Sequence, residues 1–321
     1  MIFSYDTFHA LLPTNDTMIL LIVVYYLQDG GGFLQDNLLE NLRKIGYLGP
    51  AGTFTQQAAR VLFPESALLP ISDIYNIFYA VSCKTCDVGI VPIENSTEGP
   101  VNATLDALLK TENLVITGSV ILPISHTLMG SDNITTNAEV EKILAHPQAL
   151  AQCREYIRCN YPMALLMPCA SNGEAAAKVA SASGEAWAAI GPAAAAKEYG
   201  LRIWAEDIQD SFLNSTSFIQ IEHKKEGEAV IPSAGCCTSI AFSTKNSPGA
   251  LYRMLGIFEN YSINMTKILS RPMPERPGEY IFFTDIEGYQ PEKAKKALKQ
   301  IEDEATMYRF LGSYSVIKKK G

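Results

Sequence analysis

Short apolar runs alternate with helical patterns from Ile45 onward, which is typical of an α/β domain with a mainly parallel sheet. The run "IGYLG" predicts a strand, and "TFTQQAARVLF" predicts a helix that begins at Thr53 or Thr55. We expect a second helix over "IYNIFYAVSC", a second strand over "VGIVP", and a third helix over "GPVNATLDALL" with Pro100 in its first turn. Together these two strands and three helices predict one α/β unit.

A second α/β unit is expected to begin near Ile121. Its strand-like runs are "HTLMG", "KILAH", "ALLMP" and "WAAIGP", and its helical patterns are "PQALAQCREYIRCN", "NGEAAAKVAS" and "PAAAAKEYG", the last closed by Gly200. The segment "STSFIQIEH" then returns as a strand. Two α/β lobes with a late return strand enclose a cleft, and small ligands usually bind in such clefts.

A smaller module of another kind follows the charged segment "KKEGEAVIPSAG", which Gly and Pro interrupt. The runs "TSIAFST", "GALYRMLGIFENY", "INMTKILS", "GEYIFFTDIE", "EKAKKALKQIEDEAT" and "YRFLGSYSV" read in order as βαββαβ, the ferredoxin-like pattern. The expected parts are an extension over 1–44, a two-lobed domain over 45–223 with its second lobe at about 122–205, a linker over 224–235 and a ferredoxin-like module over 236–321.

The first 44 residues differ from the rest of the chain. The apolar run "MILLIVVYYL" has ten residues, well short of the roughly 20 that span a bilayer. No Lys or Arg occurs before Arg43, so the segment lacks the positive region of a secretory signal. We interpret residues 1–44 as a poorly packed extension and expect a cytoplasmic protein.

Composition excludes several classes of function. A chain of 321 residues with 47% hydrophobic and 19% charged residues is typical of a soluble globular protein with sizeable cores. The net charge of -8 and the lack of basic clusters among aromatic residues argue against nucleic-acid binding. Seven cysteines without the regular spacing of a disulfide framework predict reduced thiols. The single CxxC motif, Cys83 and Cys86, has no further ligands at the spacing that a zinc site requires.

Two strand ends carry polar residues that suit a carboxylate ligand. The motif "ENST" follows the strand "VGIVP", and free backbone N–H groups at a helix start favour anions there. Glu94 is expected to hold this turn by accepting backbone N–H bonds. The turn "LGPAGTFT" brings hydroxyls to the same crevice, although it matches no nucleotide-binding motif. A capped turn without a ligand is the alternative. The candidate side chains are Thr53, Thr55, Asn95, Ser96 and Thr97.

A series of ordered motifs resembles prephenate dehydratases that carry a C-terminal ACT regulatory domain. The motifs are "GPAGTFT", "VPIENSTEGPVN", "HPQALAQCREYI", "GEAAAKVA", "IGPAAAAKEYGL", "NSTSF", "GAL" and "LSRP". They cover roughly Ile45 to Val316, and so many motifs in one order rarely arise by chance. On these residues the chain is identified as a member of that family.

The resemblance implies a fold and an activity. The fold is α/β: a two-lobed catalytic domain like a periplasmic binding protein, followed by a ferredoxin-like ACT domain. The activity is the conversion of prephenate into phenylpyruvate with loss of carbon dioxide and the ring hydroxyl, without a cofactor or a metal. Phenylalanine acts as feedback inhibitor, and the family favours a homodimer or homotetramer.

The resemblance also implies roles for single residues. Thr216 stands where the family has the catalytic Thr of a Thr-Arg-Phe motif, and we expect it to donate a hydrogen bond to the departing hydroxyl. Ser217 replaces the Arg of that motif, and Leu269 replaces the Glu that usually precedes Ser-Arg-Pro. The expected substrate-binding residues are Thr53, Thr55, Asn95, Ser96, Thr97, Gly99, Ser217 and Phe218. The expected phenylalanine-binding residues are Gly249, Ala250, Leu251, Asn264, Met265, Ser270, Arg271 and Pro272.

Other readings stay open at this point. Packing or hinge roles are expected for His126 and His146, because no carboxylate partner is visible in the sequence. Arogenate dehydratase is an alternative within the same class, since arogenate has the same ring and an amino-acid side chain. A non-catalytic sensor of aromatic metabolites is an alternative from another class. An assay of phenylpyruvate formation from prephenate, with arogenate in parallel, separates the three.

Overall fold

The computed structural model describes residues 43–131, 140–182, 184–224, 235–273, 276, 278–287 and 291–319. The expected extension, apart from its last two residues, and the expected linker between 225 and 234 lie outside the described residues. No helix within the described ranges is long and apolar enough to cross a membrane.

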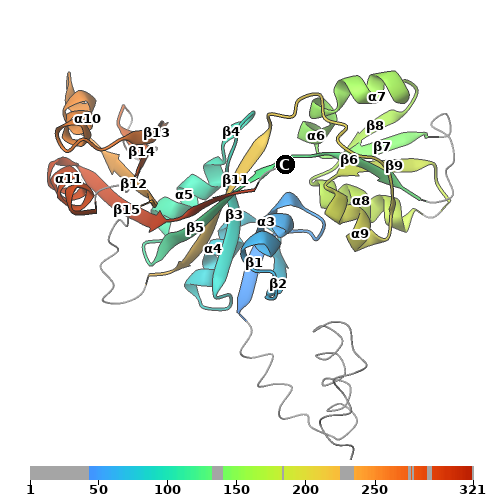
Figure 1. The fold of residues 1–321 in the computed structure, drawn as a ribbon, viewed down its shortest axis with the longest axis horizontal. Coiled ribbons are helices and arrows are strands. Elements are labelled where there is room, and N and C mark those ends of the chain that lie inside the picture. The colour runs from blue at the N-terminus through green and yellow to red at the C-terminus, as the bar shows by residue number, and fades with distance from the viewer. Residues whose placement is uncertain are drawn as a thin grey trace, which may run out of the picture. The chain divides into compact units, whose positions relative to one another are not determined.

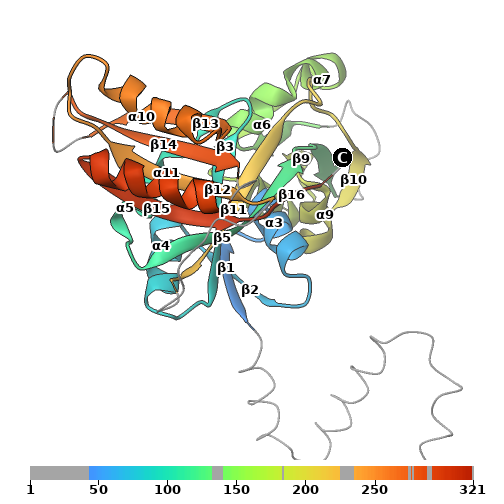
Figure 2. The same ribbon diagram turned by 60° about the vertical axis from the view of Figure 1, so that its left-hand side comes forward.

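The first lobe is built on a mixed sheet with the strand order β16-β5-β11-β3-β1-β2. Figure 1 labels these strands except β16, which is labelled in Figure 2. Strands β1, β2 and β3 are parallel, but the return strand β11 runs antiparallel between β3 and β5. The alternating pattern had predicted a mainly parallel sheet, but the sheet is mixed. The reason is that the chain returns from the second lobe and inserts β11 between β3 and β5 in the antiparallel direction. The strands are β1 (Lys44–Leu48), β2 (Ala67–Ile71), β3 (Val88–Asn95), β4 (Gly99–Pro100), β5 (Leu114–Pro123), β11 (Ser215–His223) and β16 (Val316–Lys318).

Helices cover both faces of this sheet. Helix α3 (Phe54–Leu62) packs Ala58 and Ala59 against one face, while α4 (Ile74–Ser82) and α5 (Asn102–Lys110) pack on the other. As expected, Thr53 caps α3, since its side chain accepts a hydrogen bond from the Gln56 N–H. These packed faces fix the strand ends that carry the polar residues.

The third helix begins later than the sequence had indicated. Gly99 and Pro100 form β4, which pairs with β3, and α5 starts at Asn102. Gly99 has a φ of +83°, a conformation that side chains disfavour, and this residue lets the chain fold back on β3. Pro100 therefore lies in a short hairpin and not in the first turn of the helix.

The second lobe has a five-stranded sheet in the order β10-β6-β9-β7-β8. Its strands are β6 (Thr127–Gly130), β7 (Lys142–Ala145), β8 (Leu165–Pro168), β9 (Trp187–Gly191) and β10 (Arg202–Ala205). Its helices are α6 (Pro147–Gln152), α7 (Arg154–Asn160), α8 (Asn172–Ser181) and α9 (Ala193–Tyr199). The single helix expected over "PQALAQCREYIRCN" is two helices that meet at Cys153, and Gly200 ends α9 in the left-handed conformation, as expected.

The C-terminal module has the βαββαβ order that the sequence predicted, with the sheet order β13-β14-β12-β15. Helices α10 and α11 lie on one face of this sheet (Figure 2) and enclose Phe242, Ile257 and Leu298. The other face contributes Phe283 and Leu311 to the same core as α4 and α5. The elements are β12 (Cys237–Ser243), α10 (Ala250–Asn260), β13 (Met265–Pro272), β14 (Tyr280–Glu287), α11 (Pro291–Glu304) and β15 (Met307–Tyr314).

The last strands join this module to the first lobe. Strand β16 pairs in parallel with β5, and the Ser119 N–H donates to the Ser315 carbonyl. At Gly312 the backbone of β15 passes so close to β5 that a Cβ there would lie 2.2 Å from the Ile116 carbonyl oxygen. Gly312 also has a φ of +153°, so this position demands glycine twice.

We predict that Gly312→Ala lowers the free energy of unfolding by about 2 to 4 kcal/mol, because it combines backbone strain with a clash. Gly256→Ala is the matched control, since a Cβ at Gly256 in α10 meets nothing within 4 Å. The control should be neutral or stabilising by up to about 1 kcal/mol. Urea denaturation followed by circular dichroism measures both, and equal effects of the two changes would contradict the close approach of β15 to β5.

Candidate active site between the two lobes

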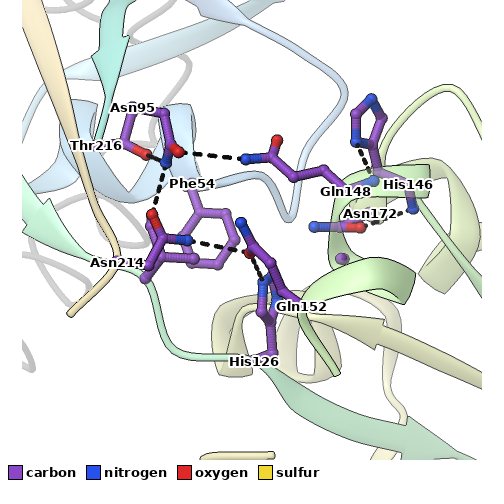
Figure 3. Close-up of a pocket in the computed structure, with 11 residues that line it drawn as sticks. Phe54, Asn95, His126, His146, Gln148, Gln152, Asn172, Asn214 and Thr216 are labelled. Carbon is purple, nitrogen blue, oxygen red and sulfur yellow. Dashed lines mark hydrogen bonds between the residues drawn. The ribbon is translucent and has the colours of Figure 1, made fainter. Parts of the chain in front are cut away.

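A pocket opens between the two lobes and is lined by side chains from both (Figure 3). Its polar residues are amides, one hydroxyl and two imidazoles, and no residue of the described lining is acidic or basic apart from the histidines. Burial lowers the pKa of His126 and of His146, which favours the neutral imidazoles. The lining residues are Phe54, Asn95, Ile124, His126, His146, Gln148, Ala149, Gln152, Asn172, Asn214 and Thr216.

Thr216 enters the pocket from the start of β11, and its side chain is held by Asn95. The two residues are register partners on β11 and β3, so their side chains lie on the same face of the sheet. The Asn95 Nδ2 donates to the Thr216 Oγ1 at 2.9 Å. Because the hydroxyl oxygen accepts this bond, the hydroxyl proton of Thr216 is free to be donated to a ligand in the pocket.

The orientation of the Asn95 amide is fixed by the turn after β3. Its Oδ1 accepts hydrogen bonds from the backbone N–H groups of Thr97 and Glu98, each at 3.0 Å. Since an N–H can donate only to the oxygen, the Nδ2 must face Thr216. Glu94, which we had expected to hold this turn, instead binds Lys267 with its carboxylate.

A chain of amides continues from Thr216 to the second lobe. The Asn95 Nδ2 also donates to the Asn214 Oδ1 at 2.8 Å, and the Asn214 Nδ2 donates to the Gln152 Oε1 at 3.0 Å. The His126 Nε2 lies 2.9 Å from the same Gln152 oxygen, so it carries the proton and its Nδ1 is an acceptor. Among the described residues neither the His126 Nδ1 nor the Gln152 Nε2 has a hydrogen-bond partner, although both are buried. A bound ligand would find an acceptor and a donor there.

Of the residues predicted to bind substrate, Asn95 lines the pocket, as does the predicted catalytic residue Thr216. The others lie around these two. The Ser96 Oγ accepts from the Ser215 N–H, and the Thr97 Oγ1 donates to the Asn214 Oδ1. Phe218 is buried in the core beneath the site, Gly99 forms β4, Thr55 is buried in α3, and Thr53 caps that helix.

Ser217 faces away from Thr216. Successive side chains of a strand point to opposite faces, and Ser217 is the register partner of Glu94, whereas Thr216 is the partner of Asn95. A cation at position 217 would therefore lie beside Glu94 and not in the pocket. The expectation that Ser217 binds substrate does not agree with this register.

Sequence reasoning missed several pocket residues. Gln148 and Gln152 belong to the quoted motif "HPQALAQCREYI", and Asn214 begins "NSTSF", so the motifs themselves held the signal. Uncharged amides have no characteristic spacing, which is why they were passed over. His126 and His146 line the pocket as well, and the His146 ring accepts from the Gln148 N–H at the start of α6.

The residues predicted to bind phenylalanine fall into two groups at opposite ends of the C-terminal sheet. The register places Arg271 beside Ile281 and Ser243 at one end, and Met265 beside Ile286 and Thr238 at the other. The first end also receives Ser270, Pro272 and the start of α10, where Gly249 has a φ of +76° and precedes Ala250 and Leu251. Asn264 lies with Met265 at the second end. Within one chain the structure does not bring the two groups together.

Residues 45–226 match the family model described as prephenate dehydratase. The chain belongs to the prephenate dehydratase family. A relative from Aquifex aeolicus, named bifunctional chorismate mutase/prephenate dehydratase, is 40% identical over 279 residues, which make up 86% of this chain and 74% of the relative. A relative from Arabidopsis thaliana, named arogenate dehydratase/prephenate dehydratase 2, chloroplastic, is 34% identical over 85% of this chain and 73% of its own length.

A solved prephenate dehydratase provides the structural comparison. The enzyme from Arthrobacter aurescens in complex with L-Phe is similar with a TM-score of 0.77 and 30% identity, over 85% of this chain and 90% of its own. The predicted fold class is confirmed: a two-lobed catalytic domain like a periplasmic binding protein, followed by a ferredoxin-like ACT domain. In the described part of the chain, no group of three or more His, Cys, Asp or Glu residues is placed to hold a metal ion.

We predict that His126 makes the folded protein sensitive to acid. Burial lowers the folded pKa of His126 below its unfolded value of about 6.5, so the unfolded chain binds the proton more tightly. The contribution of His126 to stability is complete above that pH and is lost as the pH falls toward the folded pKa.

His126→Gln keeps a donor for the Gln152 oxygen and removes the titration. Urea unfolding between pH 5 and 7 measures how the free energy of unfolding falls as the pH is lowered. In His126→Gln the slope of this fall should be smaller than in wild type by up to about 1.4 kcal/mol per pH unit. The His223→Gln variant is the control, since His223 lies at the end of β11 outside the pocket lining. The same slope in wild-type protein and His126→Gln would rule out this role.

Proposed function

We propose that this chain is a prephenate dehydratase that converts prephenate into phenylpyruvate, a carbon-oxygen lyase of phenylalanine biosynthesis. The observation that carries the proposal is the Thr216 hydroxyl, which accepts a hydrogen bond from Asn95 and keeps its proton for a ligand in an uncharged pocket. The membership of the prephenate dehydratase family supports the choice of substrate.

The reaction needs a donor to the departing oxygen. As the bond to the ring carboxylate breaks, its electron pair enters the ring, carbon dioxide leaves, and the C–O bond of the hydroxyl breaks with its electrons on oxygen. The oxygen takes up one proton from solvent to become water, and the ring becomes aromatic. Thr216 stabilises the charge that develops on the oxygen by a hydrogen bond and need not itself be a strong acid.

The uncharged lining suits the decarboxylation. A buried cation would bind the ring carboxylate of the ground state strongly, and that binding would be lost as carbon dioxide forms. Neutral donors such as the Gln152 Nε2 position the substrate with less of this cost. In this proposal the substrate donates a hydrogen bond to the His126 Nδ1, a buried acceptor without a partner among the described residues.

Phenylalanine is the proposed effector, in line with the L-Phe complex of the relative from Arthrobacter aurescens. Because the two groups of predicted residues lie at opposite ends of the ACT sheet, a site that uses both needs two copies of the module. A homodimer or homotetramer is therefore part of this proposal. A cytoplasmic location is a separate part of it and does not depend on this geometry. Within one chain the Arg271 guanidinium binds Asp106 of α5. Arg271 would therefore take part both in this ion pair and in such a phenylalanine site.

Arogenate is the second candidate substrate, because the Arabidopsis thaliana relative is named for both activities. Arogenate differs by an ammonium group on its side chain, which favours a carboxylate in the site. No carboxylate occurs among the described lining residues of the pocket. This composition favours prephenate.

A sensor that binds prephenate without turnover is the candidate from another class.

We predict that Thr216→Ala lowers kcat for prephenate by about 10²- to 10³-fold, the usual cost of losing one donor to a developing oxyanion. Ser217→Ala should stay within about threefold of wild type, because Ser217 faces away from the pocket. Ser217→Arg should be neutral or improving.

The measurement is phenylpyruvate formation from prephenate, with arogenate assayed in parallel. Binding of prephenate without any phenylpyruvate would support the sensor and remove the proposed function. Faster turnover of arogenate would move the assignment to arogenate dehydratase.

A further inference from the structure

Strand β13 of the ACT module presents two cations to the catalytic domain. Residues on β13 alternate between half-buried and exposed, and Lys267 and Arg271 both lie on the half-buried face. The Lys267 Nζ binds the Glu94 Oε2 of β3 at 2.7 Å, and the Arg271 guanidinium binds Asp106 of α5. Both ion pairs therefore join the same regulatory strand to the catalytic domain.

Lys267 lies between carboxylates from the two domains. On one side is Glu94, and on the other is Asp285 of β14, the register partner of Lys267. Asp285 is half-buried and accepts a hydrogen bond from the Ser239 hydroxyl. Burial raises the pKa of Asp285, and Lys267 opposes this shift. Without Lys267, the two carboxylates would face each other with no cation between them, which disfavours the contact between the domains.

The position of Glu94 is what gives this pair a functional consequence. Glu94 is adjacent in sequence to Asn95, whose amide directs the Thr216 hydroxyl. In the β3–β11 ladder Glu94 pairs with Ser217 and Asn95 pairs with Thr216. Lys267 therefore holds the strand end from which the polar side chains of the pocket project. Asp106 lies on α5 and is not part of that ladder.

We propose that the Lys267–Glu94 ion pair transmits the state of the ACT module to the active site. The proposal rests on the function proposed above, because the expected effector residues Met265, Ser270 and Pro272 lie on the same strand as Lys267. A ligand that displaces β13 withdraws Lys267 from Glu94, and the end of β3 no longer holds Asn95 against Thr216. Lys267 and Glu94 are thus positioning residues, and Thr216 acts on the substrate.

Ser217 makes this dependence stronger. Its small side chain lies opposite Glu94 in the ladder, at the position where the family's motif has Arg. An Arg there would give Glu94 a cation from its own domain. In this chain the cation that binds Glu94 is supplied by the ACT module.

The test compares three single variants of the full chain. Glu94→Gln and Lys267→Met remove the proposed link, and Asp106→Asn removes the other ion pair between the same strand and the catalytic domain. Calorimetry measures the binding of phenylalanine, and the prephenate assay measures its inhibition. The first two variants should bind phenylalanine within about threefold of wild type but need at least about fivefold more of it for half-inhibition. Because Arg271 is itself an expected effector residue, the control quantity for Asp106→Asn is the ratio of the half-inhibiting phenylalanine concentration to the dissociation constant, which should stay within about twofold of wild type. Lys267→Arg should retain inhibition.

A double variant moves the cation from one domain to the other. Lys267→Met with Ser217→Arg gives Glu94 a partner on β11. It should turn over prephenate at least as fast as Lys267→Met alone and should remain insensitive to phenylalanine. If the Lys267–Glu94 pair only stabilised the fold, the double variant would regain inhibition by phenylalanine together with turnover. Unchanged inhibition in Glu94→Gln and Lys267→Met, or an equal loss in Asp106→Asn, would overturn the proposal.

A second measurement needs neither substrate nor effector. The amides of Thr97 and Glu98 bind the Asn95 Oδ1, so their hydrogen exchange reports how firmly Asn95 is held. Exchange at both should be at least about fivefold faster in Lys267→Met than in Asp106→Asn. Equal exchange in the two variants would overturn the proposal even if wild-type protein fails to bind phenylalanine. Absence of prephenate turnover in wild-type protein would instead refute the proposed function, and the exchange result would then stand by itself.

Discussion

The site depends on one carboxamide, that of Asn95. Exchanging the positions of its oxygen and nitrogen would break the hydrogen bonds of both atoms. Its oxygen closes the turn after β3, and its nitrogen bonds Thr216 and Asn214. The buried groups around it gain little from each bond but would lose much if one were left unpaired. The turn that ends a strand of the first lobe therefore decides where the hydroxyl proton of Thr216 points.

The same constraint explains why an uncharged pocket can act on a dianionic substrate. Each amide of the chain from Asn95 through Asn214 to Gln152 is oriented by its neighbour, so the donors are fixed before a ligand arrives. Fixed dipoles cost no reorganisation during the reaction, whereas a flexible charged side chain would have to be held in place. The structure thus obtains polarity without a buried ion.

Much of the fold could be predicted from sequence, and the failures have physical causes. Periodicity and capping residues located helices such as α3 and α8, because an amphipathic face and a cap are local properties. Strands β2 and β5 were missed, since their pairing depends on distant strands and their patterns, "ALLPI" and "LVITGSVILP", do not alternate cleanly. Thr216 and Asn95 were found from motifs, but the face to which Ser217 points required the register of β3 and β11.

The central claim is that Asn95 donates to Thr216 and so leaves the hydroxyl proton for the substrate, and Asn95→Asp tests it most directly. A carboxylate can still accept the Thr97 and Glu98 N–H groups, but it draws the Thr216 proton to itself. Steady-state kinetics with prephenate should show kcat lower by about 10²- to 10³-fold in the variant, with the exchange of the turn amides unchanged. A kcat within about threefold of wild type would contradict the claim that this hydrogen bond directs the catalytic hydroxyl.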